Sequence, residues 1–256
     1  MLEQNIRYRA AIYAALYTPP MSISRQTATS LYNDLAERGF QKLGFEYTPP
    51  DEDKSFSILM VEKGEGRRTD SIQIDILQGS LRLLLNQTWP DSFDVACKKA
   101  DQVALAITNV LTGCQIQLIE ARIRSQAAIP EKSGNEYLMS RLMPGKKSAI
   151  AGLGTICHFG IHCELAVPEE DSVPGPLACP GREVTVEPLK QEEGFLYMEV
   201  MSNWGRTAIR LDPGKPGQAE IKPGPLETPE DLPPPSAYLR EVRDYLENRL
   251  CPFLEK

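Results

Sequence analysis

The sequence has little histidine, little cysteine and no long uninterrupted apolar run. Two histidines and six cysteines occur in 256 residues, and the cysteines are too widely spread for a disulfide framework. No stretch approaches the ~20 consecutive apolar residues of a membrane span. The opening run IRYRAAIYAALY contains arginines and precedes two prolines rather than a small-residue cleavage site. We therefore expect a soluble, cytoplasmic protein with reduced thiols and no membrane association.

Clustered positive charge is also missing. The net charge is −7, with 18 basic and 17 acidic side chains in residues 1–150 but 10 and 18 in residues 151–256. Nucleic-acid binding needs grouped lysines and arginines that displace counterions from phosphates. The pair Arg67–Arg68 is short and flanked by acids. Charge thus argues against a nucleic-acid partner, although a nucleic-acid-associated factor working through these arginines is kept as a second alternative.

No catalytic signature stands out in the sequence. The Gly152-x-Gly154 pair has Cys157 where a dinucleotide fingerprint needs its third glycine. A Gly-x-Ser-x-Gly elbow and a His-Glu-x-x-His pair are both missing. Because catalytic triads assemble in space rather than in sequence, this does not exclude an enzyme.

The order of elements predicts an α+β fold. Alternation of apolar residues with period two predicts strands, and stripes with spacings of three and four predict helices. Strands are expected at 6–17, 40–47, 55–62, 71–77, 81–85 and 115–124, and helices at 24–38, 92–112 and 133–143. In the first strand we expect Ile6, Tyr8, Ala10 and Ile12 on one face, with the tyrosine rings packing at sheet edges. Strands in runs with few helices predict mostly antiparallel sheet with helices packed on one face.

Composition changes along the chain suggest four segments. We expect an α+β domain at 1–147 and a strand-rich second half at 148–211 that could continue the same sheet. Residues 212–234 form a Pro/Gly-rich linker, and residues 235–256 form a C-terminal helix. The stretch from 212 to 236 contains eight prolines, a composition typical of extended connectors.

The segment CHFGIHC at 157–163 contains both histidines. Histidine and cysteine are common zinc ligands, so His158, His162 and Glu164 are candidate metal ligands. On a strand, however, His158 and His162 would lie about 13 Å apart, too far to share one ion. The simpler interpretation is a strand with buried cysteines and surface histidines. No cofactor is expected, and zinc at this segment is the alternative.

The final helix has an apolar stripe that must be buried somewhere. The stripe consists of Leu239, Val242, Tyr245, Leu246 and Leu250. It either docks back on its own chain, which is the default, or binds another chain.

These patterns favour a non-catalytic protein–protein interaction or assembly subunit. Its expected partner is another protein or a second copy of itself, because sheet edges pair readily with other chains. The first alternative is a metal- or small-molecule-dependent enzyme that uses the CHFGIHC segment.

Overall fold

The computed structural model describes most of the chain and shows one large antiparallel sheet. It covers residues 2, 5–18, 24–38, 40, 42–47, 55–62, 70–77, 80–86, 93–110, 114–130, 133–146, 157–167, 177, 179, 181–189, 192, 194–205, 210–211, 219–220, 227–228 and 231–255. The sheet has nine strands in the order β2-β3-β4-β5-β1-β6-β9-β8-β7. In chain order these are β1 (Ile6–Thr18), β2 (Lys42–Tyr47), β3 (Ser55–Glu62), β4 (Asp70–Leu77), β5 (Ser80–Asn86), β6 (Gln115–Ala128), β7 (Ile161–Ala166), β8 (Gly181–Pro188) and β9 (Phe195–Trp204). A separate pair joins β10 (Arg210–Leu211) to β11 (Ala219–Glu220).

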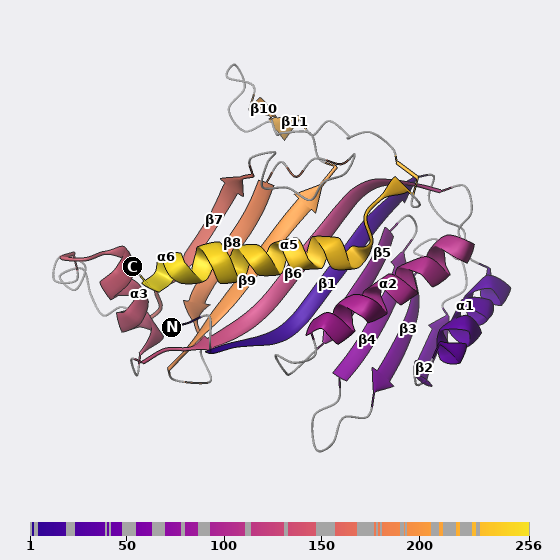
Figure 1. Cartoon of the computed structure of the whole chain (residues 1–256), viewed down its shortest axis with the longest axis horizontal. Helices are drawn as coiled ribbons and strands as arrows, with labels where there is room; N and C mark the ends of the chain where they lie inside the picture. Colours follow the sequence, from indigo (N-terminus) through magenta and orange to yellow (C-terminus); the bar gives the residue numbers. More distant parts are fainter. Residues whose placement is uncertain are drawn as a thin grey trace.

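The helices lie on one face of this sheet (Figure 1). They are α1 (Arg25–Glu37), α2 (Phe93–Val110), α3 (Gly134–Leu142) and α5 (Pro235–Tyr245), which continues through the π-helical turn η5 (Leu246–Leu250) into α6 (Cys251–Glu255). Their buried residues and the facing side chains of the sheet form the core. The expected α+β class, with helices on one face of an antiparallel sheet and a C-terminal helix, is confirmed. None of the described helices is long and apolar enough to cross a membrane.

A similar order of elements occurs on each side of the centre of the sheet, with four meander strands in the first half and three in the second. β1 and β6 pair there in antiparallel register, from Ile6 opposite Ala127 to Thr18 opposite Gln115. β1 is followed by α1, the meander β2–β5 and α2, and β5 returns to pair with β1. β6 is followed by α3, the meander β7–β9 and α5, and β9 returns to pair with β6. Strands from both sides of residue 147 therefore share one sheet, and the proposed domain division there stays a prediction.

The face assignment for β1 was wrong beyond its first residues. A register irregularity between Tyr8 and Ala10 marks a bulge opposite β6. A bulge inserts one extra residue, so the alternation changes face there. Ile6 and Tyr8 are in the main core cluster with Ala11, Tyr13, Ala15 and Tyr17, whereas Ala10 and Ile12 are outside it. The tyrosines of β1 thus lie in a central strand beneath the helices and not at a sheet edge.

Local sequence explains where the shorter helices begin. The hydroxyl of Ser24 accepts a hydrogen bond from the backbone N–H of Thr27 at 3.1 Å, as expected of an N-cap. Ser133 caps α3 in the same way through the N–H of Glu136. Asp91 and Ser92 are of residue types that favour the N-cap and directly precede α2, but they lie outside the described residues.

The C-terminal helix lies where the sequence predicted it, at residues 235–256. It runs from Pro235 to Glu255 and contains a π-helical turn. Hydrogen bonds from i to i+5 widen this turn. Residues four apart, such as Leu246 and Leu250, therefore stay on the same side and are both buried. The turn keeps the apolar stripe against the sheet over the whole helix.

Candidate functional site

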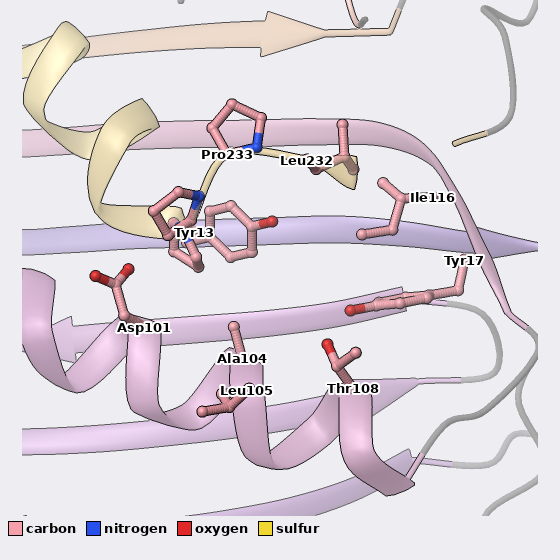
Figure 2. A pocket seen from close by; sticks show the side chains of 11 residues that line it. Tyr13, Tyr17, Asp101, Ala104, Leu105, Thr108, Ile116, Leu232 and Pro233 are labelled. Carbon is pink, nitrogen blue, oxygen red and sulfur yellow. The ribbon is translucent and has the colours of Figure 1, made fainter. Parts of the chain in front are cut away.

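A cavity of about 220 Å³ lies between β1, α2 and the segment 232–235 that leads into α5. Its polar lining residues are Tyr13, Tyr17, Asp101 and Thr108, and we call it the tyrosine cavity (Figure 2). The rest of the lining is apolar and includes Leu232 and the three prolines that follow it.

Tyr13 and Tyr17 are four residues apart on β1 and so lie on the same face of the sheet. Each side chain is only 4% exposed. Among the residues that the structure describes, neither hydroxyl has a hydrogen-bond partner. Burial raises the pKa of both tyrosines well above the ordinary value. Both hydroxyls are therefore neutral at physiological pH, and both border the cavity.

Asp101 connects α2 to the start of α5. Its Oδ1 accepts a hydrogen bond from the backbone N–H of Ser236 at 2.8 Å. The N-cap residue of α5 is Pro234, which has no side-chain cap of its own. Asp101 therefore caps α5 from a neighbouring helix and holds the proline segment in place as one wall of the cavity.

Tyr13 packs against a cluster of buried aromatic side chains. Tyr238, in the first turns of α5, lies 6.2 Å from Tyr13 between ring centroids. Its ring also meets Trp204 of β9 edge-on at 4.8 Å. All three rings are at least 96% buried. This packing fixes the positions of β1, β9 and α5 relative to one another.

The sequence patterns did not identify this cavity. The strand pattern predicts only packing roles for the tyrosines of β1, and no pattern points to Asp101 or Thr108. The lining residues come from segments more than 200 positions apart in the chain. The one sequence signal near the cavity is the triple proline at 233–235. It indicates where α5 begins, because proline lacks the N–H that a helix start would otherwise leave unpaired.

The histidines of the candidate metal site each contact β8. His158 Nε2 lies 3.1 Å from Glu187 Oε2, and His162 Nδ1 lies 3.0 Å from Thr185 Oγ1. Glu164 is directly opposite Glu183. Within the described part of the chain, no group of three His, Cys, Asp or Glu side chains is placed to hold a metal ion. The structure does not bring His158, His162 and Glu164 together, and a zinc site here stays a prediction.

β7 is the outermost strand of the second half of the sheet (Figure 1). Within the described residues, no strand pairs with its outer side, which we call the β7 edge. Ile161 and Cys163 are half-buried and pack against the core. His162 and Glu164 are exposed on the opposite face, and Leu165 is 37% exposed. Burial raises the pKa of the Cys163 thiol.

The apolar stripe of the C-terminal helix is buried in the chain's own core. Leu239, Val242 and Leu246 are fully buried and Leu250 is 4% exposed. Tyr245 is half-buried, and the guanidinium carbon of Arg182 lies over its ring, 3.9 Å from the ring centroid. Of the two alternatives for this helix, docking on its own chain is what the structure shows.

A buried ion pair joins this helix to the sheet. Arg182 of β8 is 4% exposed and pairs with Glu241 of α5. Its Nε also donates to the hydroxyl of Ser202 on β9 at 2.8 Å. A buried charge is tolerated only when paired and hydrogen-bonded, so these contacts orient α5 on β8 and β9.

The face of the sheet away from the helices carries paired charges. Arg122 contacts Glu120 at 3.1 Å and Glu199 at 3.2 Å, and Arg124 contacts Glu199 at 2.6 Å. Burial alone would raise the pKa of Glu199, but hydrogen bonds from Tyr197 and Arg124 and the charge of Arg122 outweigh it and lower that pKa. Because both guanidinium groups already have carboxylate partners, this row is a poor anion site.

Comparison with known proteins does not supply a function for these surfaces. No protein-family model matches the chain, and no curated protein matches it. What can be inferred about function therefore comes from the tyrosine cavity and the β7 edge.

Proposed function

We propose that this chain is a non-catalytic assembly protein that forms a homodimer through the β7 edge. The observation that carries the proposal is the self-complementary pattern of exposed residues along β7. An open edge has unpaired backbone N–H and C=O groups, which readily pair with another strand. Leu165 adds an exposed apolar side chain at the same place.

Symmetry restricts how two copies of β7 can pair. In a homodimer the two strands run antiparallel about a two-fold axis. If the axis is perpendicular to the sheet, the helix-covered faces of both copies lie on the same side. Each residue must then be opposite one on the same face. Centring the axis on Cys163 places Ile161 opposite Leu165 and His162 opposite Glu164 of the second copy.

This register is favourable on both faces. Apolar Ile161 and Leu165 meet on the helix-covered face, and a basic and an acidic side chain meet on the other. Centring the axis on Glu164 would instead place two carboxylates directly opposite each other, which is unfavourable. Glu164 already faces Glu183 within its own chain, so an imidazole from the second copy would relieve that contact. Charge thus favours the register centred on Cys163 over the one centred on Glu164.

The expected dimer is modest in strength. Each favourable cross-strand pair contributes roughly 0.2–1 kcal/mol, and each backbone hydrogen bond contributes about 0.5–1.5 kcal/mol net. β7 has 6 residues, so the interface is smaller than the ~1,600 Å² of standard complexes. We expect a dissociation constant on the order of micromolar, which makes the mass of the particle dependent on concentration.

Sedimentation equilibrium of the full-length protein over a range of concentrations tests the proposal. His162→Glu places carboxylates opposite each other twice per dimer and should weaken association at least tenfold. Adding Glu164→Lys to that variant makes each opposed pair attractive again and should restore association. Gln26→Glu introduces the same change of charge at an exposed site on α1 and should leave association unchanged.

Two results would count against the proposal. One is a monomer at all concentrations. The other is a dimer that His162→Glu and its combination with Glu164→Lys leave unchanged, because that dimer would use a different surface.

A further inference from the structure

We infer that the tyrosine cavity binds a small organic ammonium ion with a short apolar body. This inference does not depend on the β7 edge, because β1 and α2, which supply lining residues, lie away from β7 (Figure 1). It rests on the kind of polar atoms that the cavity offers and on its size.

The polar side-chain atoms lining the cavity are all oxygens. Tyr13, Tyr17 and Thr108 offer hydroxyls, and Asp101 offers a carboxylate. The wall formed by Pro233, Pro234 and Pro235 has no backbone N–H, because proline lacks one. A hydroxyl can both donate and accept a hydrogen bond, whereas an ionised carboxylate can only accept. The lining therefore suits a ligand that donates hydrogen bonds.

The charge of the lining favours a positively charged ligand. No lysine, arginine or histidine occurs among the described lining residues. The Oδ1 of Asp101 accepts from Ser236, and its Oδ2 has no partner among the described residues. An ammonium group has three donors and a positive charge. It can donate to Oδ2 of Asp101 and to the hydroxyl oxygens, so its charge would be offset by the carboxylate.

The tyrosine rings favour the same ligand. A cation near the face of a tyrosine ring is attracted to its π electrons by ~0.5–2 kcal/mol, and more strongly where water is excluded. Figure 2 shows the side chains of Tyr17, from β1, and Thr108, from α2, both extending into the region between these two elements. Tyr13 and Tyr17 are both more than nine-tenths buried and have hydroxyls without partners among the described residues. Both residues line the cavity, so a ligand there would come within reach of their hydroxyls as hydrogen-bond partners.

Size sets the class of molecule. The cavity of about 220 Å³ is smaller than the ~300–1,000 Å³ typical of pockets for drug-sized ligands. It has room for one ring or a short chain with an amino group. A bare divalent metal ion fits poorly, because calcium and magnesium take six or more oxygen ligands and one carboxylate supplies too few.

Isothermal titration calorimetry with 2-phenylethylammonium chloride tests the inference. The neutral compound 2-phenylethanol has the same size and serves as the matched control ligand. We expect saturable binding of one ammonium ion per chain and at least tenfold weaker binding of the alcohol. Asp101→Asn keeps an amide oxygen to cap Ser236 but removes the charge, and should weaken binding of the ammonium at least tenfold.

A second pair of variants locates the binding site. Ala104 lines the cavity from α2, so Ala104→Leu should fill it and abolish binding. Val95→Leu changes an exposed position on the same helix and should leave binding unchanged. Circular dichroism confirms that each variant is folded before titration.

The inference is overturned by any of three results. The first is no saturable binding of the ammonium ion to the folded native chain. The second is equal affinity for the alcohol. The third is unchanged affinity in Asp101→Asn or Ala104→Leu.

Discussion

The imidazole Nδ1 of His162 lies 3.0 Å from the hydroxyl oxygen of Thr185, its cross-strand neighbour on β8. This contact holds the ring along the helix-free face of the sheet, and Nε2 has no partner among the described residues. The proposed dimer uses this free nitrogen to face Glu164 of the second copy.

Replacing Thr185 should therefore weaken dimerisation indirectly. Thr185→Val removes the hydroxyl but keeps the branched shape that a strand favours. The imidazole then loses its orientation, and we expect association to weaken about two- to fivefold, equivalent to a loss of roughly 0.5–1 kcal/mol. Sedimentation equilibrium measures the effect. If the variant associates exactly as the native chain does, His162 is not held in place for this contact.

Leu165→Lys should abolish dimerisation. A lysine on an edge strand is a common natural defence against strand pairing. In the proposed register it would place a charge against Ile161 of the second copy. Val95→Lys, which alters an exposed apolar residue on α2, is the control and should not affect association. Light scattering after size-exclusion chromatography reports the mass of both variants, and a native-like dimer of Leu165→Lys would argue against pairing through β7.

Truncating the C-terminal stripe should destabilise the monomer itself. Leu246 is fully buried beneath the π-helical turn. We expect Leu246→Ala to lower the free energy of unfolding by about 2–5 kcal/mol, because it removes apolar contacts and leaves a cavity. Asn248 lies in the same π-helical turn but is exposed. Asn248→Ala should therefore change the free energy of unfolding by less than about 0.5 kcal/mol. Urea unfolding distinguishes the two, and equal small losses would mean that the stripe is not part of the core.

Glu199 should make stability sensitive to acid. Its pKa is lower in the folded chain than in the unfolded chain, so its ionised form stabilises the fold. That contribution is complete above the ordinary carboxyl pKa and is lost as pH falls through the lower, folded value. We expect Glu199→Gln to be less stable than the native chain near neutral pH, and the difference to shrink between about pH 5 and pH 3. Urea unfolding at several pH values measures it; a difference that stays constant with pH would contradict the assigned contacts with Arg122 and Arg124.

Much of the fold was predictable from local patterns. Period-two alternation identified β3, β4 and β5, and the apolar stripes identified α1 and α2, because these signals lie within a few residues of one another. The bulge at Tyr8–Ala10 was not predictable in the same way. An extra residue changes the face of every later side chain, and nothing in IRYRAAIYAALY distinguishes a bulge from regular alternation.

The cavity and the β7 edge needed the tertiary structure. Asp101 meets Ser236 across 135 positions of sequence, and the capping role of Asp101 follows from the lack of a side-chain cap at Pro234. In the chain, β7 is the first strand after β6. In the sheet, however, β9 and β8 lie between them, so β7 is at the edge. The sequence did identify the CHFGIHC segment as unusual. That part of this segment lies on an edge strand follows only from the strand order of the sheet. The proposed role in dimerisation, in place of metal binding, depends on that position.

Cross-linking at Cys163 tests the central claim most directly, because the proposed register places this thiol opposite itself. Opposed residues in an antiparallel pair have Cα atoms about 4.5–5.5 Å apart, a distance that a disulfide can span. Cys157 is exposed, so the measurement uses Cys157→Ser, oxidised with copper phenanthroline at alkaline pH because the pKa of the Cys163 thiol is raised. Non-reducing electrophoresis should show a covalent dimer that disappears on adding Cys163→Ser. A chain that stays monomeric on the gel at concentrations where it sediments as a dimer would contradict pairing of β7 with β7.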